Sequence, residues 1–523
     1  MEGGDAEPHG SGIGRRVVVI RPMSTRRVVV RGFGSGVVAG LLLVALMYLA
    51  KLVIGTTPLP QLLQQPILAV MPGFVFGFLI DTLQHAGKVV EEAGLIVGMI
   101  VGLGFLGGAW AWARKVWARP PHALSFAAAG WAIVAFVLLP ISGDGFLGLN
   151  EGPTVPLVWG LLFAAYGVVL QVGGDPASEA PIRADPGRRH LLRLMPIGIA
   201  ALSAGGLVSL LLPRWYQAVF TAPEAGLSGA SPEITPVENF YVVSKNFTDP
   251  VVSEQGWSLK VGGLVHNPLH LSMADLRALP SVTEYVTLEC VSNNVGGSLM
   301  STGQFTGVRL HDLVSMADPQ STATHARFKA RDGYTESLPL SLISGQPEIL
   351  VAYALDGAPL PTGHGFPARI LVPGHYGMKG PKWLDSIELA SQDDGGYWES
   401  EGWDRIALVK TTSRFDIPKD GDIVRAGESV RLLGVAFAGT RGISKVEYST
   451  DGGNSWAAAN LGAPLSTLTW VLWDANWIPG KAGAYVLQVR AVDGNEAPQQ
   501  PAASPSYPSG ASGYHTVRID VSG

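Results

Sequence analysis

Charged residues are scarce in this sequence. They make up 15% of its 523 residues, against roughly a quarter in a typical soluble protein, and the mean hydropathy is +0.26. The shortage falls on the first 215 residues, whereas the remainder is rich in Gly, Pro, Asp and Ser. The formal net charge is −5, which gives no attraction for nucleic acid. The composition therefore predicts a membrane-associated half and a soluble half, with no nucleic-acid partner.

Cysteine is rarer still, because Cys290 is the only one in the chain. One cysteine excludes an internal disulfide, a metal site built only of cysteines and a CxxCH haem attachment. A lone cysteine most often packs as a small, inert hydrophobic residue. Only the residues around Cys290 can therefore justify a chemical role for it.

Long apolar runs are frequent in the first 215 residues. A membrane-spanning helix needs about 20 apolar residues, and five runs approach that length: Val37–Ile54, Gly94–Ala113, Ala123–Ile141, Val155–Val172 and Leu194–Leu212. A sixth stretch, Pro66–Ile80, is short and contains Pro72. It fits either a sixth span or a segment that enters and leaves on the same side. The sequence thus predicts a basic tail at 1–35 and an all-α transmembrane anchor of five or six helices at 36–215.

Arginine and lysine favour five crossings, because positive residues collect on the cytoplasmic side of membrane proteins. They occur in the N-terminal tail, after the second run and before the fifth: Arg15, Arg16, Arg21, Arg26, Arg27, Arg31, Arg114, Lys115, Arg119, Arg183, Arg188, Arg189 and Arg193. The loop with Asp144 and Glu151 has no positive charge. All of these segments fit the rule for positive residues only if Pro66–Ile80 does not cross the membrane. The prediction is a multi-pass cell-membrane protein whose soluble half lies outside the cytoplasm; six crossings would place it inside.

The residues Arg188–Arg193, directly before the last run, resemble a twin-arginine export signal, which serves proteins that fold before export. Ser24–Arg31 is a looser match, and arginines that only set topology are the other interpretation of both. Ionisable residues inside membrane spans often mark transport or haem sites. They are few here, which favours a lipid-embedded anchor over a transporter.

Two domains are predicted after a linker at 216–234. Residues 235–393 combine short apolar runs with turn residues and a helical turn at Met273–Ala278, as in an α+β domain; the runs are Tyr285–Leu288, Ala326–Ala330 and Ile370–Val372. Residues 394–523 alternate like the strands of an all-β immunoglobulin-like sandwich: Ser429–Phe437, Lys445–Ser449, Thr469–Trp473 and Tyr485–Val492. Asp451-Gly452-Gly453 predicts a hairpin turn. A tryptophan-rich core is expected from Trp456, Trp470, Trp473 and Trp477.

The most informative stretch is Thr287–Gly297, TLECVSNNVGG, where a predicted strand gives way to a polar, Gly-rich loop at Cys290. That position presents a thiol at the end of a strand. Soft, redox-active metals favour thiolate ligands. A second stretch places Arg369, Lys379 and Lys382 close together, with Gly377 and Gly380 between them. Guanidinium, ammonium and free backbone N–H groups together suit a phosphate, although a solvated basic loop is the other interpretation.

These stretches resemble the sulfite oxidase family of molybdopterin-dependent oxidoreductases. The resemblance runs in order along the soluble half, through the Cys290 loop and six further motifs: Thr235–Tyr241, Phe305–Leu310, His364–Arg369, Val372–Leu384, Gly396–Trp403 and Gly513–His515. It implies a molybdenum–molybdopterin cofactor and oxygen-atom transfer with two electrons. It also implies a C-terminal dimerisation domain, hence a homodimer, and an electron-transfer partner such as a quinone or a cytochrome.

The resemblance also implies roles for particular residues. Cys290 would be the metal ligand, with Asn294 and Tyr376 beside the reacting centre. The residues that would contact the cofactor are Asn239, Tyr241, Val242, Asp332, His364, Arg369, Gly380, Pro381 and Lys382.

Two positions depart from the family pattern. Sulfite-oxidising members carry an arginine about four residues after the cysteine, where this chain has Asn294, and Ser244-Lys245-Asn246 replaces a histidine-bearing element. An amide binds a sulfite dianion less well than a guanidinium does. The predicted small oxo-substrate is therefore of the sulfite or the sulfoxide type. The alternative is a membrane-tethered binding or assembly module without cofactor, which would not need Cys290.

Overall fold

The computed structural model describes residues 24–64, 87–117, 122–141, 146–149, 153–174, 186–220, 229–246 and 249–523, together with residues 67, 71, 75 and 119. The chain divides into two units, one of residues 1–62 and 95–210 and the other of residues 63–94 and 211–523. Several sequence predictions fall outside the described residues: the tail up to residue 23, most of Pro66–Ile80, and the loops with Asp144, Glu151 and Arg183. The predicted domain boundaries stay predictions.

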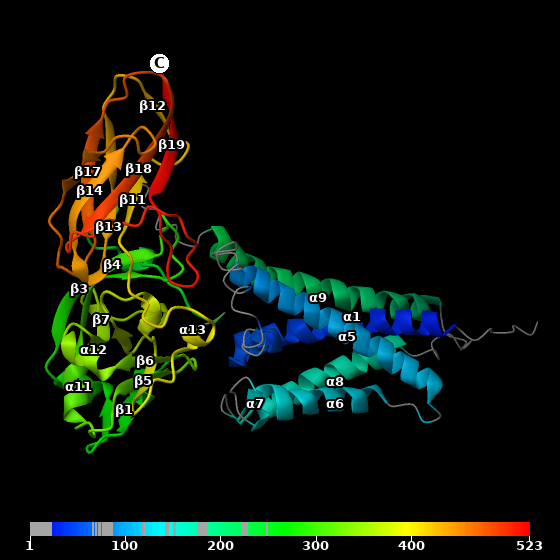
Figure 1. Cartoon of the computed structure of the whole chain (residues 1–523). Coiled ribbons are helices and arrows are strands. Elements are labelled where there is room, and N and C mark those ends of the chain that lie inside the picture. The colour runs from blue at the N-terminus through cyan, green and yellow to red at the C-terminus, as the bar shows by residue number, and fades with distance from the viewer. Residues whose placement is uncertain are drawn as a thin grey trace, which may run out of the picture. The chain divides into compact units, whose positions relative to one another are not determined.

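Five helices are long and apolar enough to cross a membrane: Thr25–Ile54, Gly87–Val116, Ala123–Ile141, Val155–Val172 and Met195–Tyr216. Figure 1 shows them in blue to green. They belong to α1 (Thr25–Ile54), α5 (Gly87–Val116), α6 (Ala123–Ile133) with η2 (Val134–Leu138) and α7 (Leu139–Ile141), α8 (Val155–Gly174) and α9 (Pro186–Phe220). Two short helices accompany them, α2 (Leu59–Leu62) and η3 (Phe146–Gly148). The five apolar runs are thus confirmed as helices.

Small residues let α1 and α5 approach closely. A Cβ atom at Gly36 would lie 2.5 Å from the backbone oxygen of Leu103, and one at Gly107 would lie 2.5 Å from the backbone oxygen of Gly32. Gly32 and Gly36 are four residues apart and therefore share one face of α1. Because no hydrophobic effect drives apolar helices together in lipid, such close packing is a common way to hold them.

The part of the sequence that follows the apolar helices and precedes the C-terminal domain forms two sheets. One has the order β2 (Leu269–Ser272), β1 (Ser258–Gly263), β10 (Leu384–Ala390), β5 (His325–Ala330) and β6 (Thr335–Pro339). The other has the order β3 (Val282–Glu289), β4 (Met300–Arg309), β7 (Leu350–Leu355) and β8 (Ala358–Pro359), and β9 (Arg369–Leu371) also pairs with β7. Apolar side chains of α10 (Met273–Ala278), α11 (Leu310–Met316) and α12 (Leu340–Gly345) share a core with both sheets. The predicted helical turn at Met273–Ala278 and the three predicted strands are confirmed within these elements.

The C-terminal region is all β (Figure 1). One sheet has the order β11 (Thr412–Ile417), β13 (Val430–Phe437), β17 (Val471–Trp477) and β16 (Asn460–Leu461). The other has the order β12 (Ile423–Arg425), β19 (His515–Ser522), β18 (Gly483–Asp493), β14 (Ile443–Ser449) and β15 (Ala457–Ala458). Side chains of both sheets, among them Phe415, Trp473 and Leu487, form one core. The two-sheet C-terminal region was therefore predicted correctly, and its immunoglobulin-like type stays a prediction.

The four tryptophans predicted for the sandwich core have different environments. Trp470 and Trp473 are fully buried, and Trp477 is partly buried against the core between the sheets. Trp456 instead lies near the surface, with the Arg490 guanidinium 4.1 Å from its ring centroid. The expectation that Trp456 belongs to the core is wrong, because it occupies the hairpin after Asp451-Gly452-Gly453, where cation–π contact replaces burial.

Candidate active site

Cys290 begins the connection between β3 and β4. Its backbone N–H donates to Leu299 O at 3.0 Å, which continues the ladder between the strands by one pair. The Asn293 side chain then ties the two ends of the loop: its amide nitrogen donates to Glu289 Oε1 at 2.9 Å, and its oxygen accepts from Leu299 N at 3.0 Å. The thiol is buried, with Sγ 3.0 Å from Ser292 Oγ. The predicted strand-to-loop junction is confirmed.

Burial raises the pKa of the Cys290 thiol. The Ser292 hydrogen bonds and the Lys382 charge act in the opposite direction, and Glu289 adds to the increase. Burial also raises the pKa of Glu289 to about 7, against the influence of Asn293 and Arg414. The second carboxyl oxygen of Glu289, Oε2, is buried without a hydrogen-bond partner among the described residues. A bound metal cation would instead lower the pKa of the Cys290 thiol, because a coordinated thiol is deprotonated outright.

Three tyrosines lie within electrostatic reach of Cys290: Tyr241, Tyr334 and Tyr376. Burial raises the pKa of each. The Tyr334 hydroxyl donates to Met378 O at 2.6 Å, and the Tyr376 hydroxyl accepts from Lys410 N at 3.3 Å. The structure thus brings the predicted Tyr241 and Tyr376 to the cysteine. Tyr334 was missed, because in the sequence it is only the residue that follows a turn at Asp332-Gly333.

Arg369, on β9, is a buried cation of unusual environment. Its guanidinium donates to three backbone carbonyls, those of His364, Gly380 and Ile370, at 3.3 to 3.4 Å. No carboxylate within the described part of the chain forms an ion pair with it. Burial lowers its pKa to about 10. An uncompensated buried charge is costly, so Arg369 fits an anionic partner that the polypeptide does not supply.

Lys382, in a neighbouring loop, is a second cation that donates to neutral oxygen atoms. Its ammonium donates to Ser244 Oγ at 2.6 Å and to the backbone oxygens of Gly363 and Val243 at 2.9 and 3.1 Å. Among the residues that the structure describes, none forms a salt bridge with it. Burial lowers the pKa of Lys382 to about 7, against the attraction of Asp249. A nearby anion would restore the charged form.

Lys379 has a different environment. It lies between two buried carboxylates, with the ammonium 2.6 Å from Glu336 Oε1 and also paired with Glu399. It donates in addition to Arg405 O at 3.0 Å. Its hydrogen-bonding capacity is therefore used within the protein, and it does not share the unpaired character of Arg369 and Lys382.

The remaining predicted residues surround this centre at varying distances. His364 is buried, its ring is 5.2 Å from that of Phe240, and burial lowers its pKa to about 4. Asp332 accepts from Asn246 Nδ2 at 3.0 Å and lies 4.0 Å from Lys245 Nζ. Gly380 and Pro381 are buried, and Gly380 O accepts from Arg369 Nη2 at 3.3 Å. Asn239 and Asn294 are partly exposed and Val242 is exposed. The cofactor roles of these residues stay predictions.

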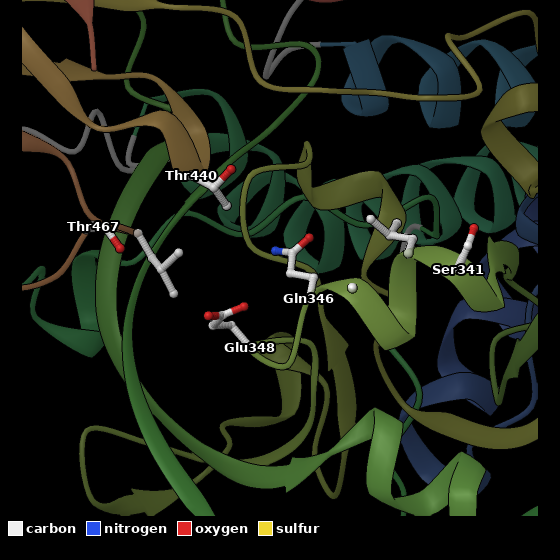
Figure 2. A pocket seen from close by; sticks show the side chains of 8 residues that line it. Ser341, Gln346, Glu348, Thr440 and Thr467 are labelled. Atoms are coloured by element: carbon white, nitrogen blue, oxygen red, sulfur yellow. The ribbon is translucent and has the colours of Figure 1, made fainter. Parts of the chain in front are cut away.

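A cavity of about 390 Å³ lies elsewhere. Figure 2 shows it between the α12 region and two loops of the C-terminal domain. It is lined by Ser341, Leu342, Gly345, Gln346, Glu348, Thr440, Thr467 and Leu468. None of the predicted site residues lines it, and Glu348 is its only charged residue, so it does not compete with the Cys290 region as a redox centre.

The chain matches two family models in succession. One is an oxidoreductase molybdopterin binding domain, over residues 246–398, and the other a Mo-co oxidoreductase dimerisation domain, over residues 405–521. Sulfite oxidase from Arabidopsis thaliana is 30% identical over 275 residues, which cover 43% of this chain and 70% of that protein. These matches define a molybdopterin-dependent oxidoreductase. The chain belongs to the sulfite oxidase family.

Other relatives show how far the similarity extends. Mitochondrial sulfite oxidase from Homo sapiens is 30% identical over 280 residues, and the chain spans about half of its length, 51%. A nitrate reductase (NADPH) from Mycosarcoma maydis is 29% identical over 301 residues, which cover 44% of this chain and 30% of that protein. The solved structure of the sulfane dehydrogenase SoxCD from Paracoccus pantotrophus matches with a TM-score of 0.49 and 20% identity, over 56% of this chain and 82% of that chain.

The residues present fit the molybdenum cofactor that this family uses. A buried thiol is available as a soft ligand. Arg369 is a buried cation and Lys382 a partly buried one, and neither has an acidic partner in the described structure, as expected of groups that receive a phosphate. The glycines at 377 and 380 allow close packing around this loop: a Cβ atom at Gly377 would lie 2.9 Å from the Tyr241 hydroxyl, and one at Gly380 would lie 2.7 Å from Ile370 O.

Proposed function

We propose that this enzyme transfers an oxygen atom to or from a small oxo-substrate, of the sulfite or sulfoxide type, with Cys290 as the metal ligand. The observation that carries this proposal is the gathering of the buried Cys290 thiol with Arg369 and Lys382, two cations that have no acidic partner in the described structure. When bound, the molybdenum–pterin cofactor supplies the exchange of one oxygen atom and two electrons. The protein holds the cofactor, excludes water and sets the local charge.

The two substrate types require opposite flows of electrons. Oxidation of sulfite takes its oxygen from water, and two protons and two electrons leave. Reduction of a sulfoxide consumes two electrons and two protons and releases water. In both directions the chain needs a redox partner, which we propose to be a quinone or a cytochrome at the membrane. The apolar helices support this location, because they would hold the site near such partners.

The charges near Cys290 favour a neutral or weakly charged substrate over sulfite. Asn294 replaces the arginine of sulfite-oxidising relatives, and its side chain has no hydrogen-bond partner in the described structure. Burial lowers the pKa of His375, which keeps its ring neutral near pH 7. Lys379 is paired with two glutamates, and Lys382 donates to three protein oxygens. Among the basic residues near Cys290 that the structure describes, only Arg369 and Lys382 lack an acidic partner, and we assign both to the cofactor phosphate.

We further propose that the helices span the membrane and place the catalytic region on the extracytoplasmic side, and that the C-terminal domain forms a homodimer. The length and composition of the helices support the first point, and the match to a dimerisation domain supports the last. A cofactor-free assembly module is not favoured, because the chain matches the molybdopterin binding domain and contains Cys290.

Steady-state kinetics of Asn294→Arg test the substrate. A hydrogen bond to a charged group contributes about 1.5–3 kcal/mol and a neutral one about half that. We therefore expect weak sulfite turnover in the native enzyme and a sulfite KM at least roughly tenfold lower in Asn294→Arg. Dimethyl sulfoxide reduction is measured beside it. Asn476→Arg, on the exposed surface of β17, adds the same charge away from the site. Tight sulfite binding by the native enzyme, unchanged in Asn294→Arg, would show that residue 294 does not contact substrate.

A further inference from the structure

We propose that the C-terminal sandwich positions the metal-ligand loop, Cys290–Leu299, and that Arg414 and His515 are the residues that do so. The proposal rests on the assignment of Cys290 as the metal ligand. It gives the C-terminal domain a part in the active site beyond dimerisation.

The loop needs support from outside, because its own hydrogen bonds hold mainly its ends. Asn293 links Glu289 to Leu299 at the base of the loop. Further out, Gly297 N–H donates to Asn294 O at 2.8 Å. Gly296, between them, has a φ of 76°, a left-handed conformation that favours glycine. A glycine pair at this point leaves the loop few side chains with which to hold its own shape.

Arg414, on β11 of the sandwich, binds the loop directly. Its Nη1 donates to Gly297 O at 2.6 Å, its Nη2 to Ser231 Oγ at 3.0 Å, and its Nε to Asp416 Oδ1 at 3.0 Å. Three bonds in three directions fix a planar guanidinium, whose donors form a rigid fork. The side chain is buried, and its charge is balanced by Asp416. Arg414 is therefore a positioning residue, since its donors are directed to protein atoms and not to a substrate.

His515, at the start of β19, supports the neighbouring residue of the loop. A Cβ atom at Gly296 would lie 2.3 Å from His515 Cδ2, so the ring packs directly on the glycine. The ring is itself fixed, because Nδ1 accepts from Phe415 N at 2.9 Å. Burial and the Arg414 charge lower the pKa of His515 to about 4. The ring is consequently neutral near pH 7 and stays an acceptor at Nδ1.

The same domain also holds the strand that leads into Cys290. β3 is at the edge of its sheet, and its free edge is covered by sandwich residues. Thr287 N–H donates to Leu468 O at 3.0 Å, Trp470 N–H donates to Thr287 Oγ1 at 2.8 Å, and the Ser466 hydroxyl donates to Tyr285 O at 2.7 Å. Strand and loop are thus both fixed by the sandwich, which leaves the cysteine between two supported segments. Such outer contacts orient a metal ligand and tune its metal.

Cys290 itself reports on this support, because it is the only thiol in the chain. In full-length protein produced without molybdate, the rate of alkylation by iodoacetamide measures how often the buried thiol becomes accessible. Arg414→Met removes the charged hydrogen bond to Gly297. We expect alkylation about tenfold faster than in the native chain. Arg414→Lys, which keeps the charge, should give an intermediate rate.

Arg441→Met is the matched control. Arg441 is also an arginine of the sandwich, with an ion pair to Asp493 at 2.7 Å and a hydrogen bond to Val409 O at 3.0 Å. None of its recorded hydrogen bonds reaches the Cys290 loop. Equal alkylation rates in Arg414→Met and Arg441→Met would overturn the proposal, because general loosening of the sandwich would then explain both.

A second variant covers the case in which Arg414→Met does not fold. His515→Asn can still accept from Phe415 N but removes the ring from Gly296. It should also accelerate alkylation, and a rate equal to the native one in this variant would contradict the role of His515. In the molybdenum-loaded enzyme, the Mo(V) electron paramagnetic resonance signal should change in both variants. If alkylation responds but this signal does not, the metal-ligand assignment of Cys290 fails while the support of the loop stands.

Discussion

The three basic residues near Cys290 form two groups that differ in their hydrogen-bond partners. Arg369 and Lys382 donate mainly to backbone carbonyls, whereas Lys379 lies between Glu336 and Glu399. The sequence placed all three within fourteen residues and could not distinguish them, because the two glutamates come from other elements. It identified Cys290 and the two unpaired cations from local motifs. Arg414 lies in none of these motifs, and His515 closes the Gly513–His515 motif with no local sign of its contact with the cysteine loop, because that contact exists only in the tertiary fold.

Glu336 gives a prediction for stability against pH. Burial and the Glu399 charge raise its pKa to about 8, although Lys379 opposes the increase. Because the unfolded chain loses this proton near pH 4.5 and the folded chain near pH 8, the proton stabilises the fold at low pH. This contribution is lost as pH rises from about 4.5 to about 8. The Lys379 pKa is raised, despite burial, by the two glutamates, so its titration lies above this window.

Glu336→Gln has no proton to lose at this position, so the loss of stability with rising pH should be absent in this variant. The free energy of unfolding should fall less between pH 5 and pH 8.5 than in the native chain, by on the order of 4 kcal/mol. Thermal unfolding followed by tryptophan fluorescence measures the difference, with Asp420→Asn, an exposed carboxylate of the sandwich, as control. Identical pH slopes in Glu336→Gln and the native chain would contradict the account of the Lys379 network.

Local patterns predicted individual elements well. The apolar runs became helices, Met273–Ala278 became α10, and the alternating runs became β13, β14, β17 and β18. Pairing between elements was not predictable, because it joins distant segments: β10 pairs in parallel with β1 although over a hundred residues separate them. The cover over the edge of β3, by residues near Leu468 and Trp470, is a further example.

The packing of α1 on α5 supplies a prediction at this scale. Gly36 faces the α5 backbone, whereas a Cβ atom at Gly34 would meet nothing within 4 Å. Gly36→Leu should separate the helices and lower the unfolding temperature of the detergent-solubilised protein, since overpacking costs about 1–3 kcal/mol. Gly34→Leu is the matched control and should leave that temperature unchanged. An equal effect of the two substitutions would show that α1 and α5 do not pack through this face.

For the whole molecule, the distribution of positive residues predicts the side of the membrane. With five crossings, alkaline phosphatase fused after Gly523 should be active, because that enzyme matures only outside the cytoplasm. A green fluorescent protein fusion at the same point, which follows the same export route, shows by the location of its fluorescence on which side the C-terminus lies. An inactive phosphatase fusion, together with a green fluorescent protein fusion that fluoresces in the cytoplasm, would indicate six crossings. Replacing Arg188 and Arg189 by Lys tests the export signal: unchanged delivery of the catalytic region would leave them as topology charges.

The central claim is that Cys290 binds the molybdenum of this family's cofactor. X-ray absorption at the molybdenum edge, on purified full-length protein, counts the sulfur atoms bound to the metal. The native enzyme should show one more molybdenum–sulfur contact than Cys290→Ser, and the variant should lose turnover. Ser292→Ala, which removes only the hydroxyl 3.0 Å from the thiol, should keep the native count. An identical sulfur count in the native enzyme and Cys290→Ser, with turnover retained, would contradict the assignment.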